Sequence, residues 1–199
     1  MHSVPASVAT VSDDVPQIEA QDAGEFRRWL STNHETSRAV WLVYWKKDSG
    51  HPSIEWSEAV DQALCFGWID SKAQSVDENR FRQYFTVRKS GSIWSKINKD
   101  NVARLDAAGL MTPAGTAAVE RAKADGSWTI LDGPEAGVVP DDLADAMEEA
   151  GVRDTFDGLT AGRRKAILGW LVMAKREATR SERIEKTITA LRSGEAPMG

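Results

Sequence analysis

The segment from Arg88 to Asn98 concentrates groups that bind anions. It carries Ser92 and Ser95 hydroxyls and flanking cations immediately before a predicted helix. Backbone amides at a helix N-terminus, hydroxyl donors and cations are what an oxyanion requires. The segment therefore predicts a ligand-binding site formed by Arg88, Ser92, Trp94, Ser95 and Asn98. The alternative is a solvated turn in which Ser92 or Ser95 caps the helix.

A single carboxylate, Asp70, is the catalytic candidate. It follows Gly67 and Trp68, and the glycine allows the chain to turn sharply out of a predicted helix into a strand. A carboxylate at a pocket mouth can act as a general base or accept a hydrogen bond from a ligand. Alternatively, Asp70 caps a loop or pairs with Arg88.

The last predicted helix carries Thr179, Arg180 and Arg183, within a basic stretch over residues 160–192. Arginine binds carboxylate or phosphate groups through two parallel hydrogen bonds. These three residues are therefore candidates to meet the Arg88 segment around one anion. The alternative is that the basic stretch pairs with the acidic residues of 132–157.

The cysteine and the histidines indicate neither a reactive thiol nor a metal site. Cys65, the single cysteine, lies at the C-terminal end of a predicted helix, where the helix dipole disfavours a thiolate, so we expect a buried structural thiol. His2, His34 and His51 form no metal-ligand spacing with it. We expect no metal site and no cofactor.

Hydrophobic periodicity indicates the elements that must position these groups. The period changes from two to three or four near Ser95, which predicts a sheet in the first half of the chain and helices in the second. The predicted strands are 39–46, 68–76 and 81–88, and the predicted helices are 22–33, 57–66, 98–108, 113–124, 140–150, 160–174 and 176–192.

The fold class that follows is α+β, with a small antiparallel sheet covered by helices and a helical C-terminal half. Residues 1–17 are expected to be a disordered tail, 18–130 the α+β unit, 131–140 a linker and 141–199 a helical unit packed on the first. The two units could equally form one integrated domain.

Length, charge and composition limit the classes of function that the chain can have. The chain has 199 residues, a formal net charge of −5, one cysteine and eight tryptophans against two tyrosines. We expect a cytoplasmic protein, because the chain has neither a signal-peptide pattern nor an apolar run long enough to enter a membrane. An acidic protein is a poor candidate for coating nucleic acid. The tryptophans favour an aromatic core or an aromatic-walled pocket.

Three motifs carry a family resemblance. They are ALCFGWIDS at 63–71, YFTVRKSGSIWSKIN at 84–98 and AKREATRSERI at 174–184, with GLMTPAG at 109–115 between the last two. In this order the chain resembles the YdeI/OmpD-associated, or bacteriocin-protection, family over residues 20–194. The resemblance implies stress resistance and a protein partner linked to envelope stress, and it carries no catalytic assignment.

Three functions remain open. The first is binding of a small anionic or aromatic molecule in a cleft walled by Trp45, Trp68 and Trp94 and floored by Arg88 and Arg180. The second is an enzyme that acts on a carboxylate- or phosphate-bearing molecule through Asp70 and the Arg88 segment. The third is a protein-interaction module whose basic C-terminal helices bind an acidic partner.

Overall fold

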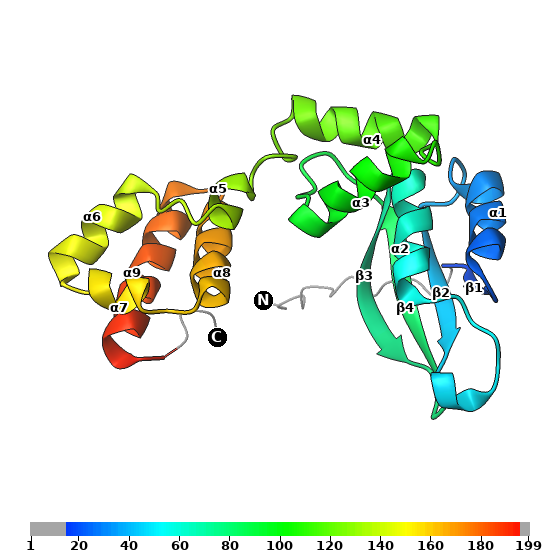
Figure 1. Ribbon diagram of the computed structural model, residues 1–199, viewed down its shortest axis with the longest axis horizontal. Helices are drawn as coiled ribbons and strands as arrows, with labels where there is room; N and C mark the ends of the chain where they lie inside the picture. The colour runs from blue at the N-terminus through cyan, green and yellow to red at the C-terminus, as the bar shows by residue number, and fades with distance from the viewer. Residues whose placement is uncertain (1–14, 196–199) are drawn as a thin grey trace, which may run out of the picture. The chain divides into compact units, whose positions relative to one another are not determined.

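The computed structural model describes residues 15–195. The chain divides into two compact units, one formed by the residues up to Arg88 with Leu105–Ala118, the other by Lys89–Arg104 with the residues from Val119 onward. The α+β class is confirmed, since the strands lie in the N-terminal half and most helices follow them (Figure 1). The predicted division into 18–130, 131–140 and 141–199 stays a prediction.

The sheet has four strands in the order β1-β2-β4-β3. The three predicted strands are present, and β1 adds to the sheet parallel to β2, so the sheet is mixed rather than purely antiparallel. The extra strand was missed because three residues are too few to show an alternation. Residues 1–14 of the predicted tail lie outside the described residues. The strand bounds are β1 (Gln17–Glu19), β2 (Ala39–Trp45), β3 (Trp68–Ser75) and β4 (Arg80–Val87).

One face of the sheet packs against the helices of the first unit. Because side chains alternate along a strand, the pairs Leu42–Gln83 and Tyr44–Phe81 place one set of side chains on a common inner face. Helix α1 (Ala23–Asn33) covers this face. The ring of its Phe26 lies 5.3 Å from the ring of Phe85.

Helix α2 (Trp56–Cys65) also packs on the inner side and ends at a sharp turn. Its start is a capping box, in which the side chains of Glu55 and Glu58 each accept from the other's backbone N–H. At its end, Gly67 has a φ of +72°, a left-handed conformation that glycine adopts without strain. This turn aims the chain directly into β3.

A close helix contact fixes the end of α2. Thr112 donates to the Cys65 carbonyl through its backbone N–H at 3.1 Å and through its hydroxyl at 2.6 Å. A Cβ at Gly115, in the first turn of α4 (Pro113–Ala124), would lie 2.2 Å from that carbonyl oxygen. The approach therefore requires glycine at position 115.

The predicted helices are present with small shifts at their ends. Three short helices were not predicted, and one of them lies inside the predicted linker 131–140. The remaining helices are η1 (Lys47–Ser49), α3 (Lys96–Ala107), α4 (Pro113–Ala124), α5 (Asp132–Glu135), α6 (Asp141–Ala150), α7 (Arg153–Asp157), α8 (Ala161–Val172) and α9 (Glu177–Ser193).

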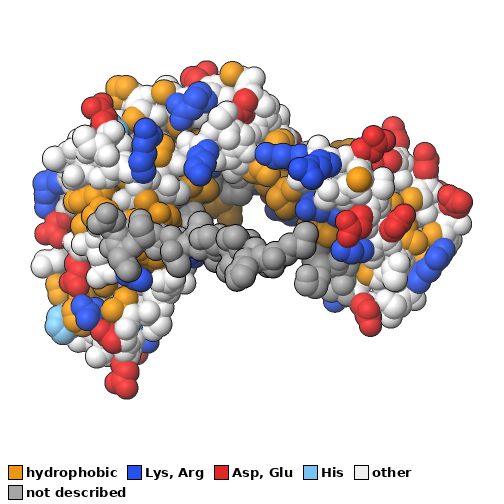
Figure 2. All heavy atoms as spheres, turned by 180° about the vertical axis from the view of Figure 1, so that it is seen from behind, with side chains coloured by type: hydrophobic (Ala, Val, Ile, Leu, Met, Phe, Trp, Pro, Cys, Tyr) orange, Lys and Arg blue, Asp and Glu red, His pale blue; other side chains and the backbone are white. Residues whose placement is uncertain are grey.

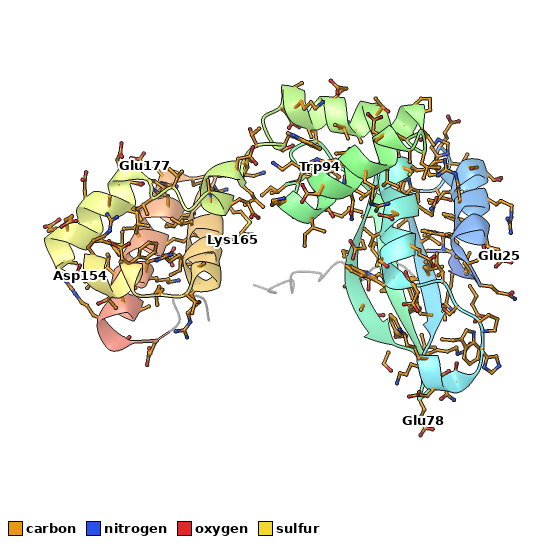
Figure 3. All side chains as sticks on the ribbon, in the orientation of Figure 1. Glu25, Glu78, Trp94, Asp154, Lys165 and Glu177 are labelled. Atoms are coloured by element: carbon orange, nitrogen blue, oxygen red, sulfur yellow. The ribbon has the colours of Figure 1, made fainter. Side chains whose placement is uncertain are left out.

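Helices α6 to α9 enclose an apolar core in the second unit. Lys165 of α8, labelled in Figure 3, also pairs with Glu135 of α5. Across residues 15–195, no helix combines the length and the apolar composition that crossing a membrane requires. The buried core residues are Leu143, Met147, Val152, Phe156, Ile167, Leu168, Leu171 and Leu191.

Candidate functional site

A β-bulge re-aims the start of β3. The pairing of β3 with β4 shifts register between Asp70 and Ala73, which leaves Ser71 outside the regular ladder. The Gln83 side chain fills the gap, because its Nε2 donates to the Ser71 carbonyl at 2.8 Å and to Oδ2 of Asp70 at 3.2 Å. Bulges of this kind are common beside functional sites.

An exposed aromatic ring is anchored on the same carboxylate. Trp56, the first residue of α2, is 52% exposed, and its indole N–H donates to Oδ2 of Asp70 at 3.3 Å. Asp70 itself is half-buried. Its other oxygen, Oδ1, accepts no hydrogen bond from the residues between 15 and 195. That oxygen is therefore available to a ligand, beside a ring that is held in place.

Two buried polar groups on the inner face have no hydrogen-bond partner among the described residues. They are the hydroxyl of Tyr44 and the indole N–H of Trp68. Leaving such a donor unsatisfied costs about 1–3 kcal/mol. Burial, and then the nearby Asp70 charge, raise the pKa of Tyr44, so its phenol is neutral and can donate. Unsatisfied groups of this kind mark a place where a water or ligand can bind.

Arg88 supplies a buried positive charge close to this carboxylate. Arg88 is 3% exposed. Its backbone N–H donates to the Gly67 carbonyl at 2.9 Å. Burial lowers the pKa of Arg88 to about 10, and the charge of Asp70 opposes that shift. Arg88 is therefore charged at neutral pH, and its charge and that of Asp70 stabilise each other.

The residues that interact with Asp70 form one site, the Asp70 cluster, which we define as Tyr44, Trp56, Asp70 and Gln83. The cluster offers a carboxylate oxygen, a hydroxyl donor and a fixed aromatic ring. This combination can orient a small molecule. Among residues 15–195, no three His, Cys, Asp or Glu side chains are grouped as a metal ion would require.

The predicted oxyanion segment is closed by a carboxylate of the chain itself. Oδ2 of Asp125 accepts from the hydroxyl of Ser90 and from the backbone N–H of Gly91, both at 2.8 Å. Hydrogen bonds from Ser127, Gly91 and Ser90 hold the pKa of Asp125 well below its ordinary range. Asp125 thus occupies two of the donors of the 88–98 segment, and ligand binding by Arg88, Ser92, Trp94, Ser95 and Asn98 stays a prediction.

Three further residues of that segment make contacts within the chain. The hydroxyl of Ser95 accepts from the backbone N–H of Asn98 at 3.2 Å, which is the helix cap that the alternative interpretation predicts. The N–H of Ser92 donates within the turn, to the Lys89 carbonyl at 3.1 Å. Trp94, labelled in Figure 3, is buried, with its ring 5.0 Å from that of Trp128.

The C-terminal arginines are engaged inside the helical unit. Arg180 donates through Nε and Nη2 to the two carboxylate oxygens of Asp142, at 2.5 and 2.7 Å. Arg183 donates to the Trp170 carbonyl, and its guanidinium lies 4.9 Å from the centre of that ring. Thr179 is half-buried in the first turn of α9. A ligand anion that binds Arg180 would have to displace Asp142. The convergence of Arg180 with Arg88 around one anion stays a prediction.

Trp45 does not share a pocket wall with Trp68. In the sheet register, Trp45 lies opposite Arg80 and Trp68 lies opposite Val87 of β4. Positions 80 and 87 are an odd number of residues apart, and side chains alternate between the faces of a strand, so the two indoles lie on opposite faces of the sheet. The indole N–H of Trp45 donates to Glu19. The prediction that both tryptophans wall one cleft is therefore wrong. Cys65 is buried, as expected.

Sequence reasoning missed three members of the cluster, although one left a signal. Gln83 stands among Phe81, Phe85 and Val87 on the face that the alternation assigns to the core. A polar side chain at such a position requires a buried partner. That partner is Asp70. Tyr44 and Trp56 left no comparable signal.

Two family models match the chain. A model described as a domain of unknown function (DUF8412) matches residues 18–118, and the model described as "Bacteriocin-protection, YdeI or OmpD-Associated" matches residues 136–194. The predicted resemblance is thus confirmed by the helical C-terminal part, whereas the part with the Asp70 cluster matches the other model. No curated protein and no solved structure was found to match.

Proposed function

We propose that this chain, which belongs to the DUF8412 family of domains of unknown function and carries a YdeI/OmpD-associated domain, binds a small flat polar molecule at the Asp70 cluster. The observation that carries the proposal is the bond between the Trp56 indole and Asp70. It holds an exposed aromatic face next to a carboxylate oxygen that the described residues leave open. Such a pair is ready to stack a ring and accept one hydrogen bond from it.

The chemistry of the cluster narrows the ligand class. Oδ1 of Asp70 selects a ligand with an N–H or O–H donor, while the Tyr44 hydroxyl selects an acceptor. The buried charge of Arg88 offsets that of Asp70, so a neutral or singly anionic ligand is favoured over a cation. These features support an aromatic or heteroaromatic acid or amide.

The enzyme alternative has less support. It requires Asp70 as a base together with an oxyanion site in the Arg88 segment, and Asp125 already accepts from Ser90 and Gly91 there. Binding without turnover needs only the Asp70 cluster. The words "Bacteriocin-protection" in the matching family description support a protective role for this binding.

Saturation-transfer NMR of the full chain with 4-hydroxybenzoate, nicotinamide, adenine and inorganic phosphate tests the proposal. We expect transfer to at least one planar probe, loss of that transfer in Trp56→Ala, and retention in Trp170→Ala, which removes an indole of the second unit. Transfer to no planar probe, or equal transfer in both variants, would contradict the proposal.

A further inference from the structure

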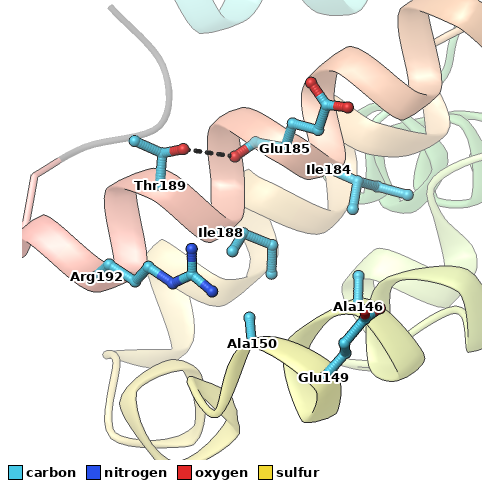
Figure 4. Close-up of a pocket in the computed structure, with 8 residues that line it drawn as sticks. All are labelled: Ala146, Glu149, Ala150, Ile184, Glu185, Ile188, Thr189 and Arg192. Atoms are coloured by element: carbon cyan, nitrogen blue, oxygen red, sulfur yellow. Dashed lines mark hydrogen bonds between the residues drawn. The ribbon is translucent and has the colours of Figure 1, made fainter.

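A groove of about 500 Å³ lies between α6 and α9 in the second unit (Figure 4). Its floor is apolar, formed by Ala146 and Ala150 of α6 and by Ile184 and Ile188 of α9, all half-buried. Within each helix the two residues are four apart and therefore lie on one face. The floor thus has the i, i+4 pattern that receives the apolar face of another helix.

The charges at the rim of this groove are not used by the described residues. Glu149, Glu185 and Arg192 line the rim, and none of them forms an ion pair within residues 15–195. The rim hydroxyl of Thr189, in contrast, is satisfied, since it donates to the Glu185 carbonyl at 3.0 Å. The rim can therefore form new ion pairs without breaking existing ones.

A stripe of acidic residues borders the groove on α6. Asp145 and Glu149 are four residues apart on one face of this helix, and Glu149 lines the groove. Within the part of the chain that the structure describes, Asp145 also lacks an ion pair. Figure 2 shows acidic side chains on the side of this unit where Figure 1 draws α6.

The neighbouring cations, by comparison, are largely engaged. Arg180 holds Asp142, Arg183 holds the Trp170 carbonyl and Lys186 pairs with Glu182 at 2.8 Å. The sequence predicted that the basic C-terminal helices bind an acidic partner, but these three cations already make contacts within the chain. The charge left beside the groove is mainly negative.

We propose that the α6–α9 groove binds a basic amphipathic helix of a partner protein. The apolar side chains of that helix, spaced by three and four, would fill the floor between α6 and α9. Its lysines or arginines would face Asp145 and Glu149. Charge complementarity of this kind sets the choice of partner and the rate of association. This surface is separate from the Asp70 cluster.

Synthetic peptides provide the test on the full chain. The probe is a labelled amphipathic peptide of Leu, Ala and Lys, about 18 residues long so that a helix can form. Its controls are a scrambled peptide of equal composition and a counterpart with Glu in place of Lys. Fluorescence anisotropy should show binding of the amphipathic Lys peptide, with at least tenfold weaker binding of both controls.

Matched variants locate the binding. Ala146→Gln fills the floor, and the double substitution Asp145→Lys with Glu149→Lys reverses the stripe. Each should weaken binding at least tenfold while circular dichroism and the melting temperature are preserved. The double substitution Asp48→Lys with Glu78→Lys makes the same charge change at two exposed positions of the first unit and should leave binding within twofold of the unsubstituted chain.

Several outcomes would overturn the proposal. Equal binding of the scrambled peptide would show adsorption to acidic surface without a groove. Unchanged binding in Ala146→Gln, or equal losses in the variant with Asp48→Lys and Glu78→Lys, would place the peptide elsewhere. Self-association in sedimentation that Ala146→Gln abolishes would assign the groove to a second copy of this chain.

Discussion

The indole N–H of Trp56 donates to Oδ2 of Asp70 at 3.3 Å, and this bond joins the first residue of α2 to the bulged edge strand β3. Gln83 donates to the same oxygen from the neighbouring strand. Two elements therefore position one carboxylate before any ligand arrives. Preorganisation of this kind reduces the entropy lost on binding.

The buried hydroxyl of Tyr44 should lower the free energy of unfolding and increase the affinity for a ligand that accepts its hydrogen bond. It is buried with no partner among the described residues, so Tyr44→Phe should raise the free energy of unfolding by up to about 1 kcal/mol. The same substitution should weaken binding of a probe that accepts its hydrogen bond. Chemical denaturation and titration calorimetry measure the two effects.

The second tyrosine provides the control for that experiment. Tyr84 lies on the outer face of the sheet, and Tyr84→Phe should change neither quantity appreciably. A loss of more than about 1 kcal/mol in Tyr44→Phe would show that the hydroxyl has a partner in the folded protein.

Gly115 should tolerate no side chain. A Cβ there would lie 2.2 Å from the Cys65 carbonyl oxygen, so Gly115→Ala forces α4 away from α2. We expect a loss of about 1–3 kcal/mol or more in the free energy of unfolding. Gly162, also in a helix, has open space around it, and Gly162→Ala should preserve or slightly raise stability. Equal effects at both positions would contradict the close approach of the two helices.

The Arg180–Asp142 pair should make stability depend on pH. The hydrogen bond from Arg180 lowers the pKa of Asp142 below its ordinary value of 3.8, so the folded state favours the carboxylate. The contribution is therefore complete well above pH 3.8 and is lost as the pH falls through the lowered value.

Arg180→Gln should accordingly cost about 0.5–1 kcal/mol at neutral pH, a modest figure because the pair is partly exposed to solvent. The difference from the unsubstituted chain should shrink as Asp142 becomes protonated. Denaturation curves at several pH values measure it. A difference that persists unchanged at low pH would assign the effect to packing of the arginine stem.

Asp125 should order the turn that follows β4. Its carboxylate accepts from Ser90 and Gly91, so Asp125→Ala should leave the Gly91 amide to exchange with solvent. We expect roughly tenfold faster hydrogen exchange at Gly91, as the loss of a charge-assisted bond implies. The amide of Leu143, on α6, serves as the reference and should not change. Unaltered exchange at Gly91 would mean that the turn is held by other contacts.

The sequence predicted the elements better than the site, for a physical reason. Periodicity records burial along one segment, so the hairpin of β3 and β4 and the helices of the second half were visible. The bulge at Asp70, the closure of the Ser90 turn by Asp125 and the pairing of Arg180 with Asp142 each join distant segments. Such pairings depend on register and packing, which local patterns do not contain.

The separation of Trp45 from Trp68 shows the same limit. Each residue fits an aromatic wall by composition, yet the parity of the β2–β4 and β3–β4 pairings puts them on opposite faces. Gln83 illustrates the converse, because its place in the β4 alternation carries a signal of a buried polar contact that the prediction overlooked.

The most direct test of ligand binding at the Asp70 cluster is the dissociation constant of the best planar probe, measured by calorimetry for the unsubstituted chain and for Asp70→Asn. The substitution preserves size but removes the charged acceptor at Oδ1. We expect binding to weaken at least tenfold, about 1.4 kcal/mol, with the melting temperature nearly unchanged. An unaltered dissociation constant in Asp70→Asn would contradict ligand binding at this cluster.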